Sequence, residues 1–339
     1  MIVLGIETSC DDTAAAVLED HRLRSSVVSS QDEVHGPYGG IVPELASRHH
    51  VANILAIVHA ALEGASMDVG GVEAVAVTHG PGLIGSLLVG LSAAKGIALR
   101  RSIPLVGVNH LEGHLLAIFL EREVEFPYLA LLVSGGHTSL YLAEAIGRYR
   151  RIGATRDDAA GEAFDKGAKM LGLGFPGGRV IDQLAKRGDP GAIRFPRARV
   201  RDARYDFSYS GLKTALREWL RRERGLAGTP SLPALPETDL VDVAASFQEA
   251  IVDMLVAPTL DAAETLGVSR IVVSGGVSAN SRLRDRIREE GEVHGIETFV
   301  PSPKFCTDNA AMIAYAGARR LERQERDPLT LNAFASLAL

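Results

Sequence analysis

The sequence predicts an α/β protein built as two lobes from a duplicated unit. Segments with strand patterns and segments with helix patterns alternate along the chain, which is typical of layered α/β folds. Residues 2–19 and 128–143 each have the pattern of a strand, a polar turn and a second strand. The two copies lie about 127 residues apart, a spacing that indicates domain duplication rather than a solenoid repeat. A chain of 339 residues is also long for a single core.

The other elements follow from periodicity and turn residues. After the first hairpin, whose turn covers residues 8–13, strand signals occur at residues 74–78 and 105–108. Helical periodicity marks residues 42–62, 86–99, 159–171, 240–266 and 309–322. A third unit of strand, turn and helix runs over residues 270–280 and continues into a helix at 281–290. Glycines cluster in turns at 80–85, 135–136, 177–178 and 275–276, which suggests backbone that approaches a ligand.

Two hairpins and a later glycine-rich turn, in this order, match the layout of the actin, Hsp70 and sugar-kinase fold. In that fold, backbone amides of both hairpin turns hold phosphates in a cleft between the lobes. We therefore expect a two-lobed, actin-like ATPase fold with an interlobe cleft. The expected first lobe is 1–113, the second lobe with the phosphate turn and nucleotide pocket is 114–300, and the segment 301–339 returns to the first lobe.

Two histidines, His110 and His114, are four residues apart in the sequence HLEGH. On a helix these positions share one face, so both rings can reach one ion. The alternative is a pair of half-buried helix histidines without a metal. Asp308, which precedes an apolar helix, is either a plain N-terminal carboxylate or the third ligand of a site with two histidines and one carboxylate. The spacing differs from the protease motif HExxH, because Glu112 does not directly follow the first histidine.

Composition places few limits on function. Hydrophobic residues make up 46% and charged residues 23% of the chain, and the net charge of −6 gives no global sign of nucleic-acid binding. The two cysteines, Cys10 and Cys306, imply no disulfide framework, and we expect both to be buried and inert. The N-terminus lacks the basic region of a signal peptide, and no apolar run is long enough for a membrane helix. We expect a cytoplasmic protein without a membrane role.

With these residues in hand, the chain resembles the TsaD/Gcp/OSGEP family, in particular its bacterial branch, over residues 5–312. The motifs that carry the resemblance are GIETSCDDT (5–13), GGIVPELAS (39–47), GPGL (80–83), HLEGH (110–114), LVSGGHT (132–138), DAAGEAFDK (158–166), FPGG (175–178), FSYSGLK (207–213), SGGVSAN (274–280) and CTDNAAM (306–312). Their number and length make a chance match unrealistic.

The resemblance implies a tRNA N6-adenosine threonylcarbamoyltransferase. Such an enzyme moves a threonylcarbamoyl group from its adenylate to N6 of the adenosine beside the anticodon and releases AMP. It further implies that a divalent metal binds to His110, His114 and Asp308, which would also be the catalytic centre. Iron(II) is favoured and zinc is also possible, since imidazole and carboxylate suit both. The implied partners are tRNA, a shorter paralogous actin-fold subunit (TsaB-like) and a P-loop ATPase (TsaE-like).

The resemblance also assigns the adenine-nucleotide ligands. Backbone of Leu132, Val133, Ser134, Gly135 and Gly136 should contact the phosphate. Asp165, Gly178, Asp182 and Asn280 should hold the adenosine and ribose, although Asp165 and Asp182 also fit plain surface positions on helices. His137 is either an acid/base group or, as turn histidines more often are, a structural donor. Two rival functions stay open: a zinc metallopeptidase and a non-catalytic actin-fold scaffold.

A basic belt occupies residues 186–224. It holds twelve Lys or Arg and five Asp or Glu, a net charge of +7, with Phe195, Tyr205, Phe207, Tyr209 and Trp219 interspersed. Basic residues among aromatics are typical of RNA-binding surfaces. We expect Arg197, Arg199, Arg201 and Arg204 to contact tRNA, whereas Trp219 is expected in the core. The proline-rich residues 225–237 are a candidate linker.

Overall fold

The computed structural model describes residues 1–200, 202–224 and 235–339. The chain divides into two compact units, Met1–Val124 with Pro301–Leu339 and Glu125–Val300. The first unit extends 11 residues beyond the expected boundary at 113, because helix α4 and the 3-10 helix that follows it pack on α11, near the end of the chain. None of the helices in the described ranges combines the length and apolar character that a membrane span requires.

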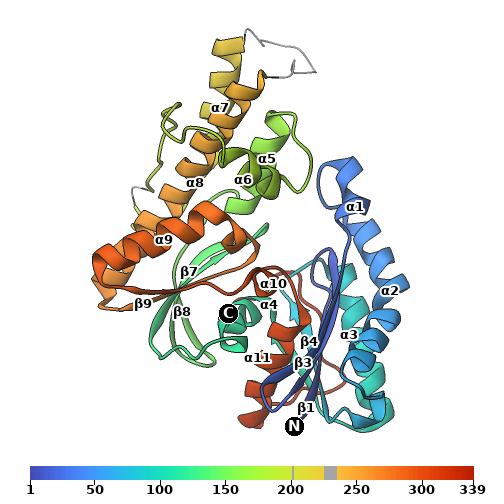
Figure 1. The fold of residues 1–339 in the computed structure, drawn as a ribbon. Helices are drawn as coiled ribbons and strands as arrows, with labels where there is room; N and C mark the ends of the chain where they lie inside the picture. Colours follow the sequence, from blue (N-terminus) through green and yellow to red (C-terminus); the bar gives the residue numbers. More distant parts are fainter. Residues whose placement is uncertain (201, 225–234) are drawn as a thin grey trace. The chain divides into compact units, whose positions relative to one another are not determined.

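The first unit is a five-stranded mixed sheet in the order β3-β2-β1-β4-β5 (Figure 1). Its strands are β1 Ile2–Glu7, β2 Asp12–Glu19, β3 Arg22–Ser30, β4 Ala74–Gly80 and β5 Leu105–Asn109. Its helices are α1 Asp32–His35, α2 Pro43–Gly64, α3 Ile84–Arg101, α4 His110–Leu116, α10 Pro303–Cys306 and α11 Ala310–Glu322, with 3-10 turns at Gly36–Tyr38, Val69–Gly71 and Ala117–Leu120. The expected hairpin is present as β1 and β2, which pair antiparallel.

Both faces of this sheet are covered. Leu4, Ile6 and Val17 point into a core shared with α2 and α3, whereas Ala14 and Ala16 face α11. Small residues let α11 approach the sheet closely. Position 5 requires glycine, because a Cβ there would lie 2.3 Å from the Ala310 carbonyl oxygen at the start of α11. The position of α11, and of the loop before it, is therefore fixed by direct contact with β1.

The second unit repeats the first. Its sheet has the order β10-β9-β6-β7-β8, with strands β6 Tyr128–Val133, β7 Thr138–Ala145, β8 Arg148–Ala154, β9 Arg270–Ser274 and β10 Glu297–Phe299. Its helices are α5 Ala160–Met170, α6 Gly177–Ala185, α7 Ser210–Arg224, α8 Glu237–Leu266 and α9 Ser281–His294, with a 3-10 turn at Gly276–Ala279. Each sheet has three antiparallel strands followed by two parallel ones, joined in the same order. This shared topology confirms the predicted duplication.

Candidate metal centre and nucleotide site

Helix α4, which contains the candidate metal ligands His110 and His114, begins where β5 ends. The Asn109 side chain caps α4 by accepting a hydrogen bond from the Leu111 backbone N–H (2.9 Å), and every residue of this helix is buried. Because His110 and His114 are one turn apart, their rings meet edge to face with centroids 4.7 Å apart. The helix therefore presents both imidazoles in one direction, as the sequence predicts.

Asp308 completes the group from the loop between α10 and α11. Its Oδ1 lies 3.1 Å from His114 Nε2 and 3.5 Å from His110 Nε2. One ligand atom from each of the three residues falls within 4.8 Å of the others. Asn309, not Asp308, is the N-cap of α11, since its side chain accepts from the Met312 N–H. Asp308 is thus directed toward the histidines rather than used as a cap.

The charges around this group favour a bound cation. Burial and the Asp308 carboxylate raise the pKa of Asp11 to about 6 and that of Asp12 to about 8. Burial alone would lower the pKa of His110, but Asp308 and Glu7 outweigh it and raise that pKa to about 9. Burial lowers the pKa of His114, which is therefore neutral and able to ligate. The raised pKa values of Asp11 and Asp12 reflect crowding of carboxyl groups around Asp308, and a divalent ion there would relieve that repulsion.

Both cysteines lie near this centre, and neither shows signs of activation. Burial, with the neighbouring Asp11 carboxylate, raises the pKa of the Cys10 thiol well above its usual value. Cys306 is buried, and its Sγ lies 3.4 Å from the backbone oxygens of Pro301 and Ser302. Cys10 is half-buried rather than buried as we expected. A thiol whose thiolate is suppressed is a poor nucleophile, which is consistent with the expected lack of reactivity.

In the second unit, the predicted phosphate turn joins β6 and β7. The Ser134 N–H donates to the His137 carbonyl (2.8 Å), and the His137 N–H donates to Ser134 Oγ (3.1 Å). Gly135 and Gly136 are exposed at its tip. Helix α5 begins against the turn, where the Gly161 N–H donates to the Ser134 carbonyl. A Cβ at Gly161 would lie 2.7 Å from that oxygen, so only glycine permits this approach.

Of the four residues predicted to hold the adenosine, the two aspartates bond to the sequence neighbours of the other two, Gly178 and Asn280. Asp165 Oδ1 accepts from the backbone N–H of Gly177 (2.8 Å), the neighbour of Gly178. Asp182 Oδ1 accepts from the backbone N–H (3.1 Å) and hydroxyl (2.7 Å) of Ser281, the neighbour of Asn280. Both carboxylates therefore bond to the starts of helices, Asp165 to α6 and Asp182 to α9, a structural role that the sequence did not indicate.

Both the oxygen and the nitrogen of the Asn280 side-chain amide form hydrogen bonds. Its Oδ1 accepts from the Leu283 N–H at the start of α9, and its Nδ2 donates to Gln248 Oε1 of α8 (2.7 Å). Sequence reasoning did not identify Gln248 and Ser281, which hydrogen-bond to the predicted site residues Asn280 and Asp182. Only Ser281 had a local signal, since it directly follows the SGGVSAN motif.

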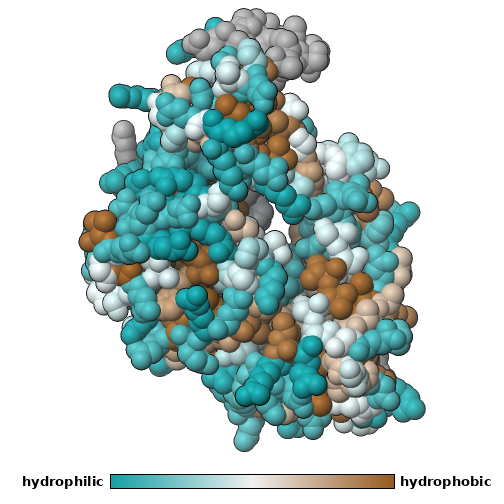
Figure 2. Space-filling model, in the orientation of Figure 1, coloured by the Kyte–Doolittle hydropathy of each residue, from teal (hydrophilic) through white to brown (hydrophobic). Residues whose placement is uncertain are grey.

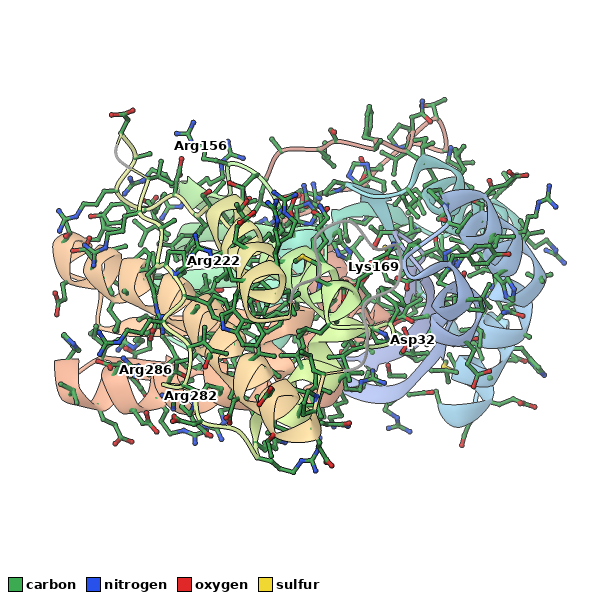
Figure 3. The ribbon with its side chains drawn as sticks, turned by 90° about the horizontal axis from the view of Figure 1, so that it is seen from above. Asp32, Arg156, Lys169, Arg222, Arg282 and Arg286 are labelled. Atoms are coloured by element: carbon green, nitrogen blue, oxygen red, sulfur yellow. The ribbon has the colours of Figure 1, made fainter. Side chains whose placement is uncertain are left out.

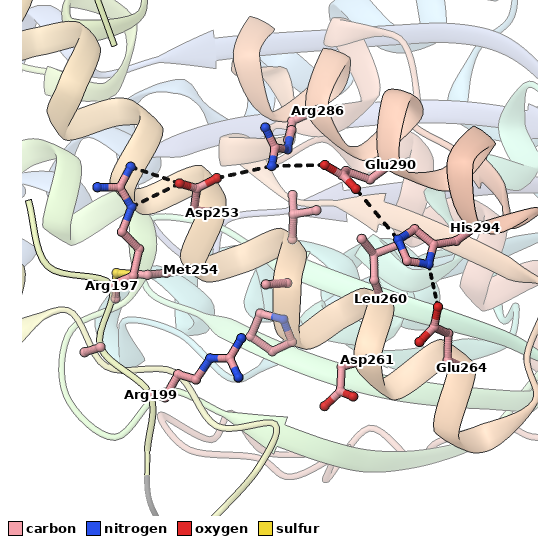
Figure 4. Close-up of a pocket in the computed structure, with 14 residues that line it drawn as sticks. Arg197, Arg199, Asp253, Met254, Leu260, Asp261, Glu264, Arg286, Glu290 and His294 are labelled. Atoms are coloured by element: carbon pink, nitrogen blue, oxygen red, sulfur yellow. Dashed lines mark hydrogen bonds and ion pairs between the residues drawn. The ribbon is translucent and has the colours of Figure 1, made fainter. Parts of the chain in front are cut away.

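The basic belt splits into two parts. Arg197 pairs with Asp253, and Arg199 lines the pocket beside that pair without an ion-pair partner among the described residues (Figure 4). Arg204 pairs with Asp261, so both paired carboxylates belong to α8. Arg201, like most of the candidate linker, lies outside the described residues. On α7, Arg217 and Arg222 are exposed and Arg221 contacts only Glu218 of its own helix among the described residues. Trp219 packs against the core, as expected.

Comparison with known proteins decides the family. A model of the TsaD family, described as tRNA N6-adenosine threonylcarbamoyltransferase, matches residues 22–315. This chain belongs to the TsaD family. Relatives named tRNA N6-adenosine threonylcarbamoyltransferase include one from Anaeromyxobacter sp. (strain Fw109-5), 55% identical over 98% of both chains, and one from Geobacter metallireducens, 53% identical over 100% of this chain and 97% of the relative.

Solved structures confirm the fold at much lower identity. Full-length HypF, in a phosphate- and nucleotide-bound form, is similar with a TM-score of 0.61 and 12% identity, over 96% of this chain and 46% of HypF. The activator of 2-hydroxyisocaproyl-CoA dehydratase from Clostridium difficile, with bound ADPNP, gives a TM-score of 0.53 and 12% identity over 97% and 99% of the two chains. These likenesses support the two-lobed actin-like fold of this TsaD-family chain.

Proposed function

We propose that this chain transfers the threonylcarbamoyl group of threonylcarbamoyl-AMP to N6 of the adenosine beside the anticodon of tRNA. Membership of the TsaD family carries the proposal, and the group formed by the buried His110 and His114 with the half-buried Asp308 supports it. In the reaction, N6 attacks the carbamoyl carbon, the bond from that carbon to the phosphate oxygen breaks, and AMP leaves with the electron pair while N6 loses a proton.

The mixed anhydride already contains a good leaving group, so the enzyme needs no covalent nucleophile. Its residues must instead bind and orient the two substrates. The free backbone of Gly135 and Gly136, next to the N-terminus of α5, suits a phosphate. Asp165, Gly178, Asp182 and Asn280, which line neighbouring helices, would hold the adenosine and ribose. We assign His137 to the structure of the turn, since its backbone closes it.

The metal centre fits one divalent ion. Two imidazoles and one carboxylate leave positions open for substrate, an arrangement used by iron(II) and also suited to zinc. We favour iron(II). Such an ion would supply Lewis-acid polarisation of a carbamoyl or phosphate oxygen. The lowered pKa of His114, caused by burial, favours the neutral ring that can ligate, and Asp308 Oδ1 lies 3.1 Å from its Nε2.

Contacts with tRNA are best supported on α7. Arg217, Arg221 and Arg222 are exposed there, and within the described part of the chain no carboxylate of another element neutralises them. Lys169, on α5 against which α7 packs, is exposed on the face where Arg222 also lies (Figure 3). Changing the three α7 arginines to glutamine should weaken tRNA binding and lower the log–log salt slope by about 0.7–0.9 for each lost phosphate contact.

A variant with Arg197, Arg199 and Arg204 changed to glutamine serves as the comparison. In the native protein, carboxylates already neutralise the guanidinium groups of Arg197 and Arg204. We expect a smaller change in slope there. A larger effect from this loop than from α7 would restore the loop as the main RNA contact.

For the partners, we propose a TsaB-like paralogous subunit and a TsaE-like P-loop ATPase, with all three in the cytoplasm. An apolar strip supports the first of these. Val51 and Leu55 of α2 and Ile84 and Leu88 of α3 are 44–73% exposed on two helices that pack together, and apolar side chains reach the surface in that part of the view (Figure 2). A subunit of the same fold has equivalent helices with which to cover it.

The rival functions fit less well. Glu112, the carboxylate that lies between the two histidines in the sequence, is buried with Oε2 3.8 Å from Arg320. It faces a cation rather than the histidine pair, so it cannot serve as a general base there. A scaffold, in turn, has no use for three ligand atoms gathered in a buried site.

The test is tRNA-dependent AMP release from threonylcarbamoyl-AMP. The native protein should release AMP and leave threonylcarbamoyl on tRNA, and His114→Ala should lose metal and most activity. His59→Ala removes an exposed histidine of α2 and should change neither. Peptide cleavage without AMP release would establish the peptidase function, and a metal-free protein without transfer activity would establish the scaffold.

A further inference from the structure

Glu7 is a carboxylate at the centre of a sheet where an apolar residue would be expected. It ends β1, the strand between β2 and β4, and it is completely buried. Burying a charge is costly unless hydrogen bonds and an opposite charge compensate for it. A residue that stays in this position despite that cost needs a specific explanation, and its neighbours supply one.

Three donors surround the carboxylate. Glu7 Oε1 accepts from the Ser9 backbone N–H (2.5 Å), while Oε2 accepts from the Thr78 hydroxyl (2.6 Å) and from His110 Nδ1 (3.0 Å). An ionised carboxylate has no proton to give. The nitrogen at 3.0 Å must therefore be the donor, so His110 Nδ1 has a proton even though Ser9 Oγ also lies 3.1 Å from it.

The protonated Nδ1 determines what the other ring nitrogen does. His110 Nε2 lies on the Asp308 side of the ring, 3.5 Å from Oδ1, and is free to ligate once its own proton leaves. By contrast, His114 Nδ1 is buried with no hydrogen-bond partner among the described residues. Both rings have Nε2 near Asp308, but within the described chain only His110 has a carboxylate at Nδ1 as well.

We propose that Glu7 is the positioning residue of the metal centre: it holds His110 in the Nδ1–H tautomer and in the orientation that presents Nε2 to the ion. This proposal rests on the proposed metal site. It adds to that site a residue of strand β1, which lies 103 positions before the histidine that it orients. Carboxylates that hold a ligating histidine in this way raise its basicity and its affinity for metal. Glu7 acts through His110 and has no role in touching the substrate.

Glutamine at position 7 cannot satisfy the same three donors. If its NH₂ takes the place of Oε1, it opposes the Ser9 N–H. If the NH₂ takes the place of Oε2, it opposes His110 Nδ1–H and forces the ring into the Nε2–H tautomer, which cannot ligate through Nε2. Either orientation disturbs the site without changing the side chain's size.

The experiment compares Glu7→Gln with Glu112→Gln. Glu112 is also buried and lies on α4 between the two histidines, but it faces Arg320. Zinc and cobalt(II) affinities are measured by chelator competition on the purified full chain, and the visible spectrum of the cobalt(II) form is recorded. We expect Glu7→Gln to bind roughly 10- to 100-fold more weakly, with an altered cobalt spectrum. Glu112→Gln should keep the native affinity and spectrum.

Unchanged affinity and spectrum in a folded Glu7→Gln protein would overturn the proposal. The His110→Ala protein distinguishes this outcome from failure of the proposed metal site. If the metal does not bind at this site, His110→Ala should bind metal with the same affinity as the native protein. If Glu7→Gln does not fold, NMR of the zinc-loaded native protein decides. His110, assigned by comparison with His110→Ala, should show a protonated Nδ1, and a proton on Nε2 instead would overturn the proposal.

Discussion

Replacing Gly5 by alanine tests whether the contact between β1 and α11 sets the position of Asp308. The new Cβ would lie 2.3 Å from the Ala310 carbonyl oxygen and 2.8 Å from the Ala314 Cβ. An ordinary contact needs 3.4 Å, so the strand and the helix must separate by about 1.1 Å. Metal ligands tolerate errors of only about 0.2 Å. Because Ala310 follows Asp308 by two residues, this separation displaces the carboxylate relative to the histidines.

We expect two effects of Gly5→Ala. Overpacking should lower the free energy of unfolding by about 1–3 kcal/mol, and the metal affinity should fall at least tenfold. Thermal or urea unfolding measures the first, and chelator competition with zinc measures the second. Gly96→Ala is the matched control, because a Cβ there meets nothing within 4 Å in an exposed position of α3. It should stabilise the helix by about 0.5–1 kcal/mol and leave metal affinity unchanged.

A Gly5→Ala protein with native metal affinity and native stability would refute the reasoning. It would mean that the sheet and helix separate without moving Asp308, and that the loop before α11 is positioned by something other than β1.

Two further predictions concern the second unit. Gly161→Ala should push the phosphate turn away from α5 and lower AMP affinity at least tenfold, without changing metal content. Gly211→Ala is the control, because a Cβ there meets nothing within 4 Å, and it should leave AMP affinity unchanged. Equal AMP affinities of the two variants by calorimetry would contradict this. Glu249→Gln should lower the free energy of unfolding at pH 7 by about 1.5–3 kcal/mol, because Glu249 accepts two hydrogen bonds from Arg282 (2.7 and 2.9 Å). Since those bonds hold the pKa of Glu249 below its usual 4.5, their contribution is present above that pH and is lost as the pH falls through the lower value. The urea midpoints of variant and native protein should therefore converge once the pH is below that lowered pKa, and a difference that persists there would rule out the ion pair as its source.

The sequence predicted the elements that have strong local signals. Helix 42–62 is Pro43–Gly64, and helix 309–322 is Ala310–Glu322, because periodic apolar residues and end signals such as Pro43 and the cap Asn309 define them. The third strands of each unit, β3 and β8, were not predicted. Both lie at a sheet edge and consist mostly of exposed or half-exposed residues, such as Arg22 and Arg148, so no apolar pattern marks them.

The site divides in the same way. The histidine pair and Asp308 could be found because each lies in a local motif with recognisable chemistry. Glu7 could not, since its role depends on Thr78 and His110, which are 71 and 103 residues away. The pairing of Arg197 and Arg204 with α8 was missed for the same reason. Sequence reasoning counted the charges of the belt but not the carboxylates that face them from residues 253 and 261.

The first unit is interrupted by the whole of the second, and this order has a consequence for synthesis. His114 and Asp308 are 194 positions apart. At about 5–20 residues per second, the ribosome needs on the order of 10–40 s to pass from one to the other. During that interval the nascent sheet lacks α11, which covers β1, β2 and β4, and the two histidines lack their carboxylate. The three proposed ligands therefore come together only late in translation, which would place metal binding after most of the chain has been made.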